Sequence, residues 1–435
     1  MISSIIFCIL FIGSATFFYI NAKKIRRNIF IGKDFPITDH KGERLKTMLL
    51  VALGQSKMVT RPISAVMHIF VYVGFVLINI EVMEMFVDGI THSHRAFSFL
   101  GGFYNFLIGF FEILALLVFI GVVVFWLRRN VVKVKRFLNS ELNGFPRLDA
   151  NVILITEMVL MTALMLMNAA DQNLQMRGSE HYHEAGSFPV SGFFAPMLRG
   201  VSTSSLIMIE RTTWWLHIIG IFAFLNYLPY SKHLHILLAF PNTYFSNLKP
   251  KGQFNTLDAV TDVVAPNFDP AYVAKTDPNH PIRFGVKDVH DLGWKNLMDA
   301  YSCTECGRCT SSCPQNMTGK KLSPRKIMMD TRDRMEEVGR NMDANKGVFV
   351  DDGKSLLGDY TTAEEVWACN TCNACVQECP INIDPLAIIL EMRRFLVMEQ
   401  SQSPSELNAM FTNIENNGAP WQFSPADRAN WTKEV

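Results

Sequence analysis

Long apolar segments dominate the first half of the chain and predict membrane-spanning helices. A spanning helix needs about 20 predominantly apolar residues. Five segments meet this requirement, and charged residues gather in the loops between them. The pattern therefore predicts a five-helix transmembrane bundle. The five segments are 2–20, 62–87, 102–127, 148–170 and 212–240.

The first apolar segment lies where a secretory signal peptide would lie. A signal peptide carries its positive charges before the apolar run. Here the first basic residues, Lys23 and Lys24, follow that run. We therefore interpret 2–20 as a retained membrane anchor.

Basic residues in the loops predict the orientation of the bundle, because short loops rich in Lys and Arg stay on the cytoplasmic side. The loops after the first and third helices are strongly basic, whereas 88–101 contains only Arg95 and 171–211 mixes basic residues with acids. We expect a multi-pass protein of the bacterial inner (cytoplasmic) membrane, with the N-terminus outside. The fifth helix then delivers the rest of the chain to the cytoplasm.

From about Asn255 onward the chain is polar and charged, and its local signals predict further helices. Ser323 fits an N-cap with Pro324 at the first helical position, before a helix over 326–338. Pro385 similarly begins a helix over 386–398. The predicted fold class is mainly α: a five-helix transmembrane bundle followed by a helical, ferredoxin-like cytoplasmic domain. The expected divisions are a membrane domain 1–245, a linker 246–290, a cysteine domain 291–400 and a tail 401–435.

The overall charge balance narrows the choice of partners. The chain has 41 Lys and Arg against 40 Asp and Glu, a formal net charge of +1. Such a balance provides no dominant basic surface, which argues against nucleic acid as a partner. Eight of the nine cysteines lie between Cys303 and Cys379, clustered as metal ligands are and as suits a reducing compartment. The ninth, Cys8, is expected to be a small buried apolar residue.

The clustered cysteines form two runs of C-x2-C-x2-C-x3-C-P, with Gly307 and Asn373 at equivalent positions of the two loops. This is the spacing of bacterial two-cluster ferredoxins, in which the fourth cysteine of each run binds the other cluster. Zinc also binds C-x2-C pairs, but the repeated four-cysteine run with its proline favours two [4Fe–4S] clusters. The expected ligand sets are Cys303, Cys306 and Cys309 with Cys379, and Cys369, Cys372 and Cys375 with Cys313.

Histidines within the predicted membrane helices suggest haem, because a histidine at membrane depth is costly unless paired or bound to metal. His68 and His235 are expected at one depth near the inner side, which suits bis-histidine ligation of haem b. Hydrogen bonding to neighbouring helices is the alternative. His217 precedes His235 by 18 residues, five helical turns, so both should share a face, with His233 on nearly the opposite one. Pro229 would bend this helix.

Whether His217 binds a second haem is left open by the sequence. At the depth of His217 the second helix contains residues 78–82, none of which is histidine. The remaining candidates for a second ligand are His92, His94, Met83 and Met85.

Carboxylates within the spanning segments are candidates for proton uptake or release when a quinone changes its redox state. Hydrogen bonding between helices in the protonated form is the alternative. His181 and His183, in an outer loop, are expected to be solvated. The carboxylates are Glu81, Glu84, Glu112 and Glu157.

Motifs for other chemistry are absent from the sequence. No G-x-G-x-x-G follows a strand signal, and there is no P-loop, nucleophile elbow or H-E-x-x-H. We expect no flavin, nucleotide or hydrolytic site in this chain, and no catalytic residue is assigned.

Three stretches of the chain carry a resemblance to known families. The sequences W-W-L-H at 214–217 and L-P-Y-S-K-H-L-H at 228–235 resemble the fifth helix of nitrate reductase gamma-subunit-like cytochromes b. R-P at 61–62, with His68 and the G-F pair at 74–75, resembles their second helix. The cysteine region resembles the C subunit of heterodisulfide reductase. Together they resemble fused iron–sulfur membrane oxidoreductases, including the electron-transfer-flavoprotein:menaquinone oxidoreductases, over essentially the whole chain.

The chain departs from these families in two places. The gamma subunit has two histidines on its second helix and holds two haems, whereas this chain has His68 alone. Fused relatives continue past the segment that resembles 416–421 into cysteine-rich CCG domains, whereas this sequence stops at Val435. The resemblance therefore implies that a separate CCG-domain subunit, an electron-transfer flavoprotein, or both are partners.

Our hypothesis is a membrane subunit of an oxidoreductase. It would relay electrons between menaquinone or another quinone, haem b, the two clusters and the cytoplasmic partner, in a direction that the sequence leaves open. The competing hypothesis is a haem-free membrane anchor for a ferredoxin-like interaction module in a larger assembly. A zinc-stabilised adaptor is the third.

Overall fold

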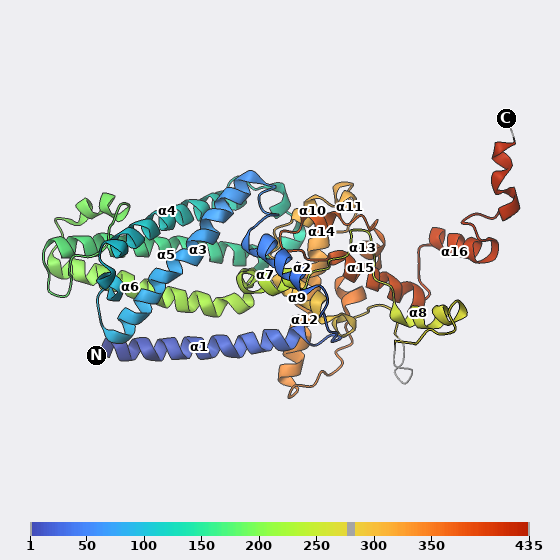
Figure 1. The fold of residues 1–435 in the computed structure, drawn as a ribbon, viewed down its shortest axis with the longest axis horizontal. Coiled ribbons are helices and arrows are strands. Elements are labelled where there is room, and N and C mark those ends of the chain that lie inside the picture. The colour runs from blue at the N-terminus through green and yellow to red at the C-terminus, as the bar shows by residue number, and fades with distance from the viewer. Residues whose placement is uncertain (1, 276–282, 434–435) are drawn as a thin grey trace.

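The computed structural model describes residues 2–275 and 283–433, and this part of the chain is built from helices without a β-strand. A bundle of long helices occupies one end of the molecule (Figure 1). The cysteine-rich domain lies next to this bundle, and the C-terminal tail extends beyond the cysteine-rich domain. The predicted mainly α fold is confirmed.

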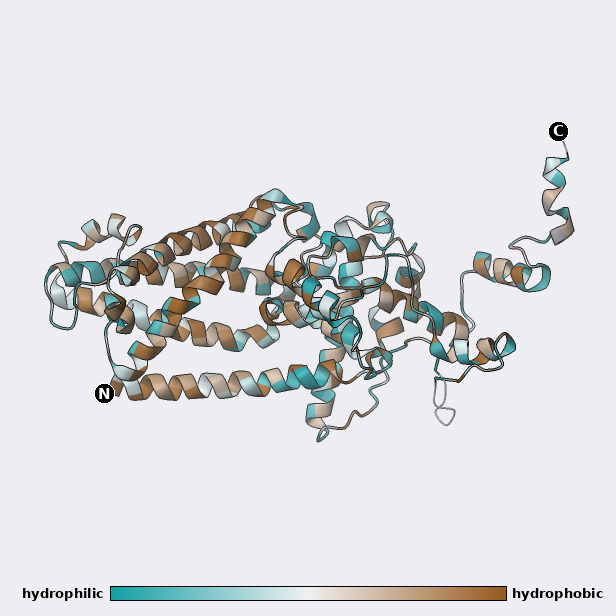
Figure 2. Cartoon of the chain, viewed as in Figure 1, coloured by the Kyte–Doolittle hydropathy of each residue, from teal (hydrophilic) through white to brown (hydrophobic). Residues whose placement is uncertain are grey.

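Within the described residues, five helices have the length and apolar composition needed to cross a membrane. Many of their apolar side chains are exposed, as in α1, where Ile9 and Ile12 are both about two-thirds exposed at 65% and 64%. The hydropathy colouring shows the same division between an apolar bundle and a mixed second domain (Figure 2). The five helices are α1 (Ile2–Ile29), α3 (Pro62–Thr91), α4 (Gly102–Asn130), α5 (Phe145–Met176) and α6 (Thr203–Tyr227).

Small residues allow the helices of the bundle to approach closely. A Cβ added to Gly74 of α3 would lie 2.2 Å from Val118 of α4. A Cβ on Gly220 of α6 would lie 2.5 Å from Leu160 of α5. Such glycine contacts are typical of membrane helices, whose association depends on close packing.

The fifth apolar segment is not the continuous helix 212–240 that the sequence predicts. Helix α6 begins earlier, at Thr203 behind the N-cap Ser202, and ends at Tyr227. Two short 3₁₀ turns, Leu228–Tyr230 and Lys232–Leu234, lead into α7 (His235–Tyr244). Pro229 explains the break, since proline lacks the amide hydrogen and clashes with the preceding turn. The whole-turn relation expected between His217 and His235 is therefore wrong.

The cysteine domain is a set of short helices around one apolar core. Ser323 accepts a hydrogen bond from the amide of Lys326 at the start of α12, which confirms the predicted cap. The Asp384 side chain similarly caps α15, which begins at Pro385 as predicted. The helices are α9 (Trp294–Ser302), α10 (Arg308–Ser311), α11 (Pro314–Met317), α12 (Pro324–Ala344), α13 (Ala363–Trp367), α14 (Ala374–Glu378) and α15 (Pro385–Arg394).

The cysteine domain packs directly on the end of α1. The Asn28 side chain donates to the Tyr301 hydroxyl at 2.9 Å, and Arg27 donates to the carbonyl of Gly339 at 3.0 Å. A Cβ on Gly339 would lie 2.5 Å from the Asn28 side chain, so this contact needs glycine. The first helix thus supports the second domain as well as the bundle.

The segments outside these two units are α2 (Lys41–Met48), α8 (Asp258–Val264) and α16 (Ser405–Asn417). Helix α2 lies between the bundle and the cysteine domain (Figure 1). Helix α8 falls within the predicted linker, whose residues 276–282 lie outside the described residues. Helix α16 belongs to the predicted tail.

Candidate functional site

The two cysteine loops share one backbone conformation. Glu305 and Gly307 in the first loop have φ of 54° and 72°, and Thr371 and Asn373 in the second have φ of 56° and 60°. Positive φ is uncommon outside glycine. Its recurrence at both equivalent positions shows that the repeated cysteine spacing is also a repeated fold.

Glycine is required in the first loop because of the surroundings of that loop. A Cβ on Gly307 would lie 2.5 Å from Nη1 of Arg325. Arg325 is fully buried and donates to the carbonyl of Arg136 and to Glu141, at 2.8 and 2.7 Å. The first loop is thus pressed against residues that follow α4, whereas Asn373 fits in the second loop.

The fold brings the eight cysteines together in two groups that mix the runs. A cavity of about 20 Å³ is lined by five of them: Cys303, Cys306, Cys309, Cys375 and Cys379. Cys369 lies close enough to Cys313 and Cys372, and Cys375 close enough to Cys369 and Cys313, to influence them electrostatically. Cys379 thus lies with cysteines of the first run, and Cys313 lies near cysteines of the second, whereas the two ligand sets stay a prediction.

Burial makes these thiols poor acids in the protein alone. It raises the pKa of Cys303 to about 11 and that of Cys379 to about 12, and it also raises the pKa of Cys309. A thiolate here needs positive charge beside it, which the iron of a cluster supplies. Backbone amides also point at the sulfurs: Ile383 N donates to Cys379 Sγ at 3.3 Å.

A buried ionic network ties the first loop to the membrane bundle. Glu305, between Cys303 and Cys306, pairs with Lys232 and accepts from Arg332 at 2.8 Å. Lys232 is 8% exposed and also donates to the carbonyl of Pro146 at 2.7 Å. Sequence reasoning missed this network, because no motif relates Lys232 to a residue more than 70 positions away. The one signal in the sequence was the acidic residue Glu305 within the first cysteine run, which indicates a need for a basic partner.

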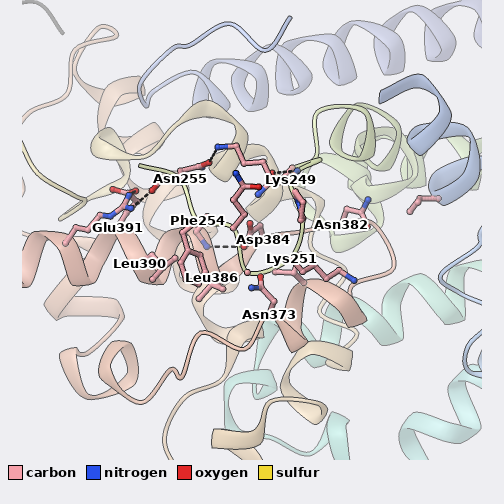
Figure 3. A pocket seen from close by; sticks show the side chains of 18 of the residues that line it. Lys249, Lys251, Phe254, Asn255, Asn373, Asn382, Asp384, Leu386, Leu390 and Glu391 are labelled. Carbon is pink, nitrogen blue, oxygen red and sulfur yellow. Dashed lines mark hydrogen bonds and ion pairs between the residues drawn. The ribbon is translucent and has the colours of Figure 1, made fainter. Parts of the chain in front are cut away.

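The second loop is more open to solvent, although Glu378 near its end pairs with Arg61, the N-cap of α3, at 2.9 Å. Its Cys372 is exposed, and Trp367 and Ala368 before the loop line an open groove of about 990 Å³ with the start of the tail. A second cavity of about 340 Å³ lies on the other side of this loop, between Asn373, α15 and the segment 247–255 (Figure 3). Lys57 reaches this cavity and donates to Asn382 Oδ1 at 2.8 Å.

Three histidines lie together at the end of the bundle nearest the cysteine domain. The rings of His233 and His235 are 5.4 Å apart between centroids, and His68 lies close enough to both to influence them electrostatically. His233 is thus not on the opposite face, as a continuous helix would require, because the turns after Pro229 change its direction. Nδ1 of His235 bonds to the carbonyl of Lys232 at 3.1 Å, whereas the buried Nδ1 of His68 has no hydrogen-bond partner.

His217 lies apart from these three histidines. It is 2% exposed, and its Nδ1 bonds to the carbonyl of Leu160 on α5 at 3.0 Å. Among the candidate second ligands, His94 is engaged by Asp171, with 2.9 Å between Nε2 and Oδ1. The structure thus gives His217 a helix–helix hydrogen bond.

The membrane carboxylates differ in how well they are satisfied. Glu112 accepts from the amides of Val190 and Ser191 and from Asn168, and it therefore binds α4 to its neighbours. Glu84 accepts from the Phe97 amide and the Tyr104 hydroxyl, both at 2.8 Å. These contacts favour the structural alternative for both residues. His181 and His183 are exposed, as expected.

Comparison with known proteins shows which domain family the cysteine domain matches. Residues 302–383 match the 4Fe-4S dicluster domain. The chain is an iron–sulfur protein. A probable iron–sulfur-binding oxidoreductase, FadF, of Bacillus subtilis is 29% identical over 90% of the chain, and an EtfAB:quinone oxidoreductase of Syntrophomonas wolfei is 28% identical over 99% of it.

The chain spans 55% and 59% of the length of these two relatives. The cysteine domain has further relatives: the C subunit of a ferredoxin/F(420)H(2)-dependent CoB-CoM heterodisulfide reductase of Methanosarcina acetivorans is 34% identical over 25% of the chain and 52% of that relative. No solved structure matches the chain. The iron–sulfur part of the predicted resemblance is confirmed.

Proposed function

We propose that this chain is a membrane subunit of an oxidoreductase that relays electrons between a quinone, one haem b, two [4Fe–4S] clusters and a partner on the cytoplasmic side. The observation that carries the proposal is the position of Lys232. Its carbonyl accepts from His235 Nδ1, and its ammonium group pairs with Glu305 inside the first cysteine run. One residue thus joins the candidate haem ligand to the candidate cluster loop.

The histidine geometry fits haem ligation. In haem and metal sites the ligating histidine donates its other ring N–H to a carbonyl, which fixes the tautomer. His235 has this arrangement with Lys232, so its Nε2 is available as the ligand nitrogen. His68 lies close enough to His235 to be influenced by it and has a buried ring nitrogen without a partner. We assign these two residues as the ones that would hold the haem. The haem would supply one-electron redox chemistry; the chain orients the ligands and keeps water away.

A second haem is not part of the proposal. His217 has the same bond from Nδ1 to a carbonyl, but His94, one of its candidate partners, is held by Asp171. We therefore assign His217 a role in the contact between α5 and α6.

The two clusters would take the ligand sets that the spacing predicts. We assign Cys303, Cys306, Cys309 and Cys379 to a cluster near the bundle, and Cys313, Cys369, Cys372 and Cys375 to a cluster on the far side. The far cluster then lies beside the open groove at Trp367, so the partner would exchange electrons there. We propose domain boundaries at residues 245, 290 and 400, which separate the membrane domain, the linker, the cluster-binding domain and the tail.

The partners and the orientation are proposed from the relatives and from the loop charges. One relative is named for EtfAB and quinone and others for heterodisulfide reduction, so we propose an electron-transfer flavoprotein or a CCG-domain subunit as the cytoplasmic partner. The basic loops support a position of the cysteine domain in the cytoplasm of a bacterial cell, which we propose. The direction of electron flow depends on which partner binds.

The His235→Ala variant tests the proposal. We expect the reduced-minus-oxidised spectrum of the purified wild-type protein to show a b-type alpha band, and the variant to lose this band while retaining both clusters. His233→Ala is the matched control, since His233 lies beside His235 but is not assigned as a ligand. A wild-type protein that lacks the band would support the haem-free anchor, and zinc without iron would support the adaptor.

A further inference from the structure

A small cavity lies among residues at the end of α3. This end of α3 is at the end of the bundle opposite to the cysteine domain (Figure 1). The volume of the cavity is about 20 Å³, and its lining comes from α3, the following loop, α5 and α6. Most lining side chains are charged although the surrounding helices are apolar. The charged and titratable residues of the lining are Glu81, Glu84, Asp88, His94, Arg95, Asp171, Glu210 and Arg211.

Three polar atoms at this cavity are buried without a hydrogen-bond partner. They are both carboxyl oxygens of Glu81 and Nδ1 of His94. The contact of Glu81 with Arg95 is an ion pair at 3.7 Å, which is too long for a hydrogen bond. Burying such atoms without a hydrogen bond destabilises the folded state, so these three atoms need a further hydrogen-bond partner.

The other groups around the cavity are already satisfied. Arg95 donates to Asp171 at 2.9 Å and to Asn168 at 2.8 Å. Glu84, one turn from Glu81 and equally buried at 3% exposure, has two full-strength hydrogen bonds. The unmet hydrogen-bonding capacity is therefore confined to Glu81 and His94.

The size of the cavity identifies the missing partner. A water needs about 10–15 Å³ and two to four polar neighbours, and this cavity offers about 20 Å³ with three unpartnered atoms. A quinone ring would not fit. We propose that a bound water joins Glu81 to His94 and that these two residues share one exchangeable proton at this end of the bundle.

The transfer is balanced without another reactant. The Glu81 carboxyl gives its proton to the water while the water gives one of its own to Nδ1 of His94. Nε2 of His94 meanwhile keeps its bond to Asp171. The products are a carboxylate, an imidazolium and the same water.

The surrounding charges are arranged to tolerate this exchange. Arg95 faces Glu81, and Asp171 faces His94. The other charged and titratable groups nearby come from the three helices and from the loop that follows α5. They are Glu84 and Asp88 on α3, Tyr104 and Glu112 on α4, Glu210 and Arg211 on α6, and Tyr182 and His183, whose rings contact that of His94.

A route to the surface adjoins the site. The ring of the exposed His183 lies 5.1 Å from the ring of His94, centroid to centroid. The use of this proton in quinone chemistry rests on the proposed function; the existence of the site does not.

Infrared difference spectroscopy of the full chain in lipid nanodiscs tests the site. As pH is changed, we expect one protonated-carboxyl band to appear and disappear in the wild type. Glu81→Gln should lose this pH-dependent component completely, and His94→Gln should leave a carboxyl band that no longer responds to pH. The matched control is Glu84→Gln, which should retain the component because both Glu84 oxygens already have partners.

Separate measurements keep the outcome clear. Iron content and thermal unfolding verify that each variant is folded, and Glu81→Met serves if Glu81→Gln does not fold. A pH-dependent band that survives in Glu81→Gln would overturn the proposal. A high-resolution map with Glu81 bonded directly to Arg95 and no water would also overturn it, as would a pH response that EDTA removes, because a metal ion would then occupy the cavity. None of these measurements needs haem or quinone. A failure of the proposed redox function can therefore be distinguished from a failure of the proposed proton site.

Discussion

The two cysteine loops have the same spacing and the same backbone, but their surroundings differ. The first loop is held by buried charges: Glu305 pairs with Lys232, and Arg308 donates to the carbonyl of Lys57 at 2.9 Å. The second loop exposes Cys372 and adjoins an open groove. A motif thus determines which cofactor can bind, whereas the neighbours decide which loop contacts the membrane domain and which is accessible to a partner.

The largest effect is expected from paired cysteine substitutions that test whether ligation crosses between the loops. Cys306→Ala and Cys379→Ala should each remove the same cluster, so their combination should lose no more than about four iron atoms. Cys306→Ala combined with Cys313→Ala should lose both clusters. Iron analysis and electron paramagnetic resonance of the reduced proteins measure this. Equal iron in the two double variants would refute crossed ligation.

The next effect tests the buried ion pair that distinguishes the first loop. Lys232→Met leaves Glu305 buried beside Arg332 only, and breaking one side of a buried pair costs about 3–5 kcal/mol. We expect the clusters to bleach at clearly lower urea concentration and the midpoint potential of the nearer cluster to fall, because a positive charge is lost. An unchanged potential would show that Lys232 has no electrostatic effect on this cluster.

The two loops should also respond oppositely to acid. Although burial alone would raise the pKa of Glu305, Lys232 and Arg332 lower it overall, so its stabilising effect is present above its unfolded pKa and is lost as pH falls. Asp330 accepts a hydrogen bond from the Thr361 hydroxyl, which precedes the second loop. Burial raises the pKa of Asp330 to about 6. The folded state therefore binds this proton more tightly, and stability falls by up to about 3 kcal/mol as pH rises from 4 to 6.

Substitutions separate these two responses. Asp330→Asn should flatten the loss of stability between pH 4 and 6, and Glu305→Gln should flatten the loss on the acid side. Urea titrations of cluster absorbance across this pH range measure both. An Asp330→Asn protein with the wild-type pH dependence would contradict the assignment.

The smallest effect is expected at an exposed ion pair in the lining of the groove beside the second loop. Lys321 pairs with Glu364 at 2.6 Å beside the groove, with side chains 69% and 63% exposed. Lys321→Ala should leave the urea midpoint of cluster bleaching unchanged, since solvent screens exposed pairs. A loss as large as that in Lys232→Met would mean that exposure does not distinguish the loops.

Much of the architecture was predictable because it depends on local physical signals. The length of the apolar segments predicted the membrane helices, and the N-cap Ser323 and the first-turn residue Pro385 predicted the starts of two further helices. The break after Tyr227 was foreseeable only in part, because Pro229 signals a disturbance but not the direction of the chain beyond it. The prediction that His233 faces away from His235 failed for that reason.

By itself, the sequence determined the mainly α fold and the apolar helices, and it predicts the pairing of each fourth cysteine with the other run. These depend on chain length, hydrophobicity and short-range geometry, which act between residues that are near in the chain. Only the tertiary structure decided that Lys232 meets Glu305, that Glu112 is satisfied while Glu81 is not, and which cysteine loop faces the bundle. Charge pairing and burial depend on distances between remote segments, and those distances exist only once the chain has folded.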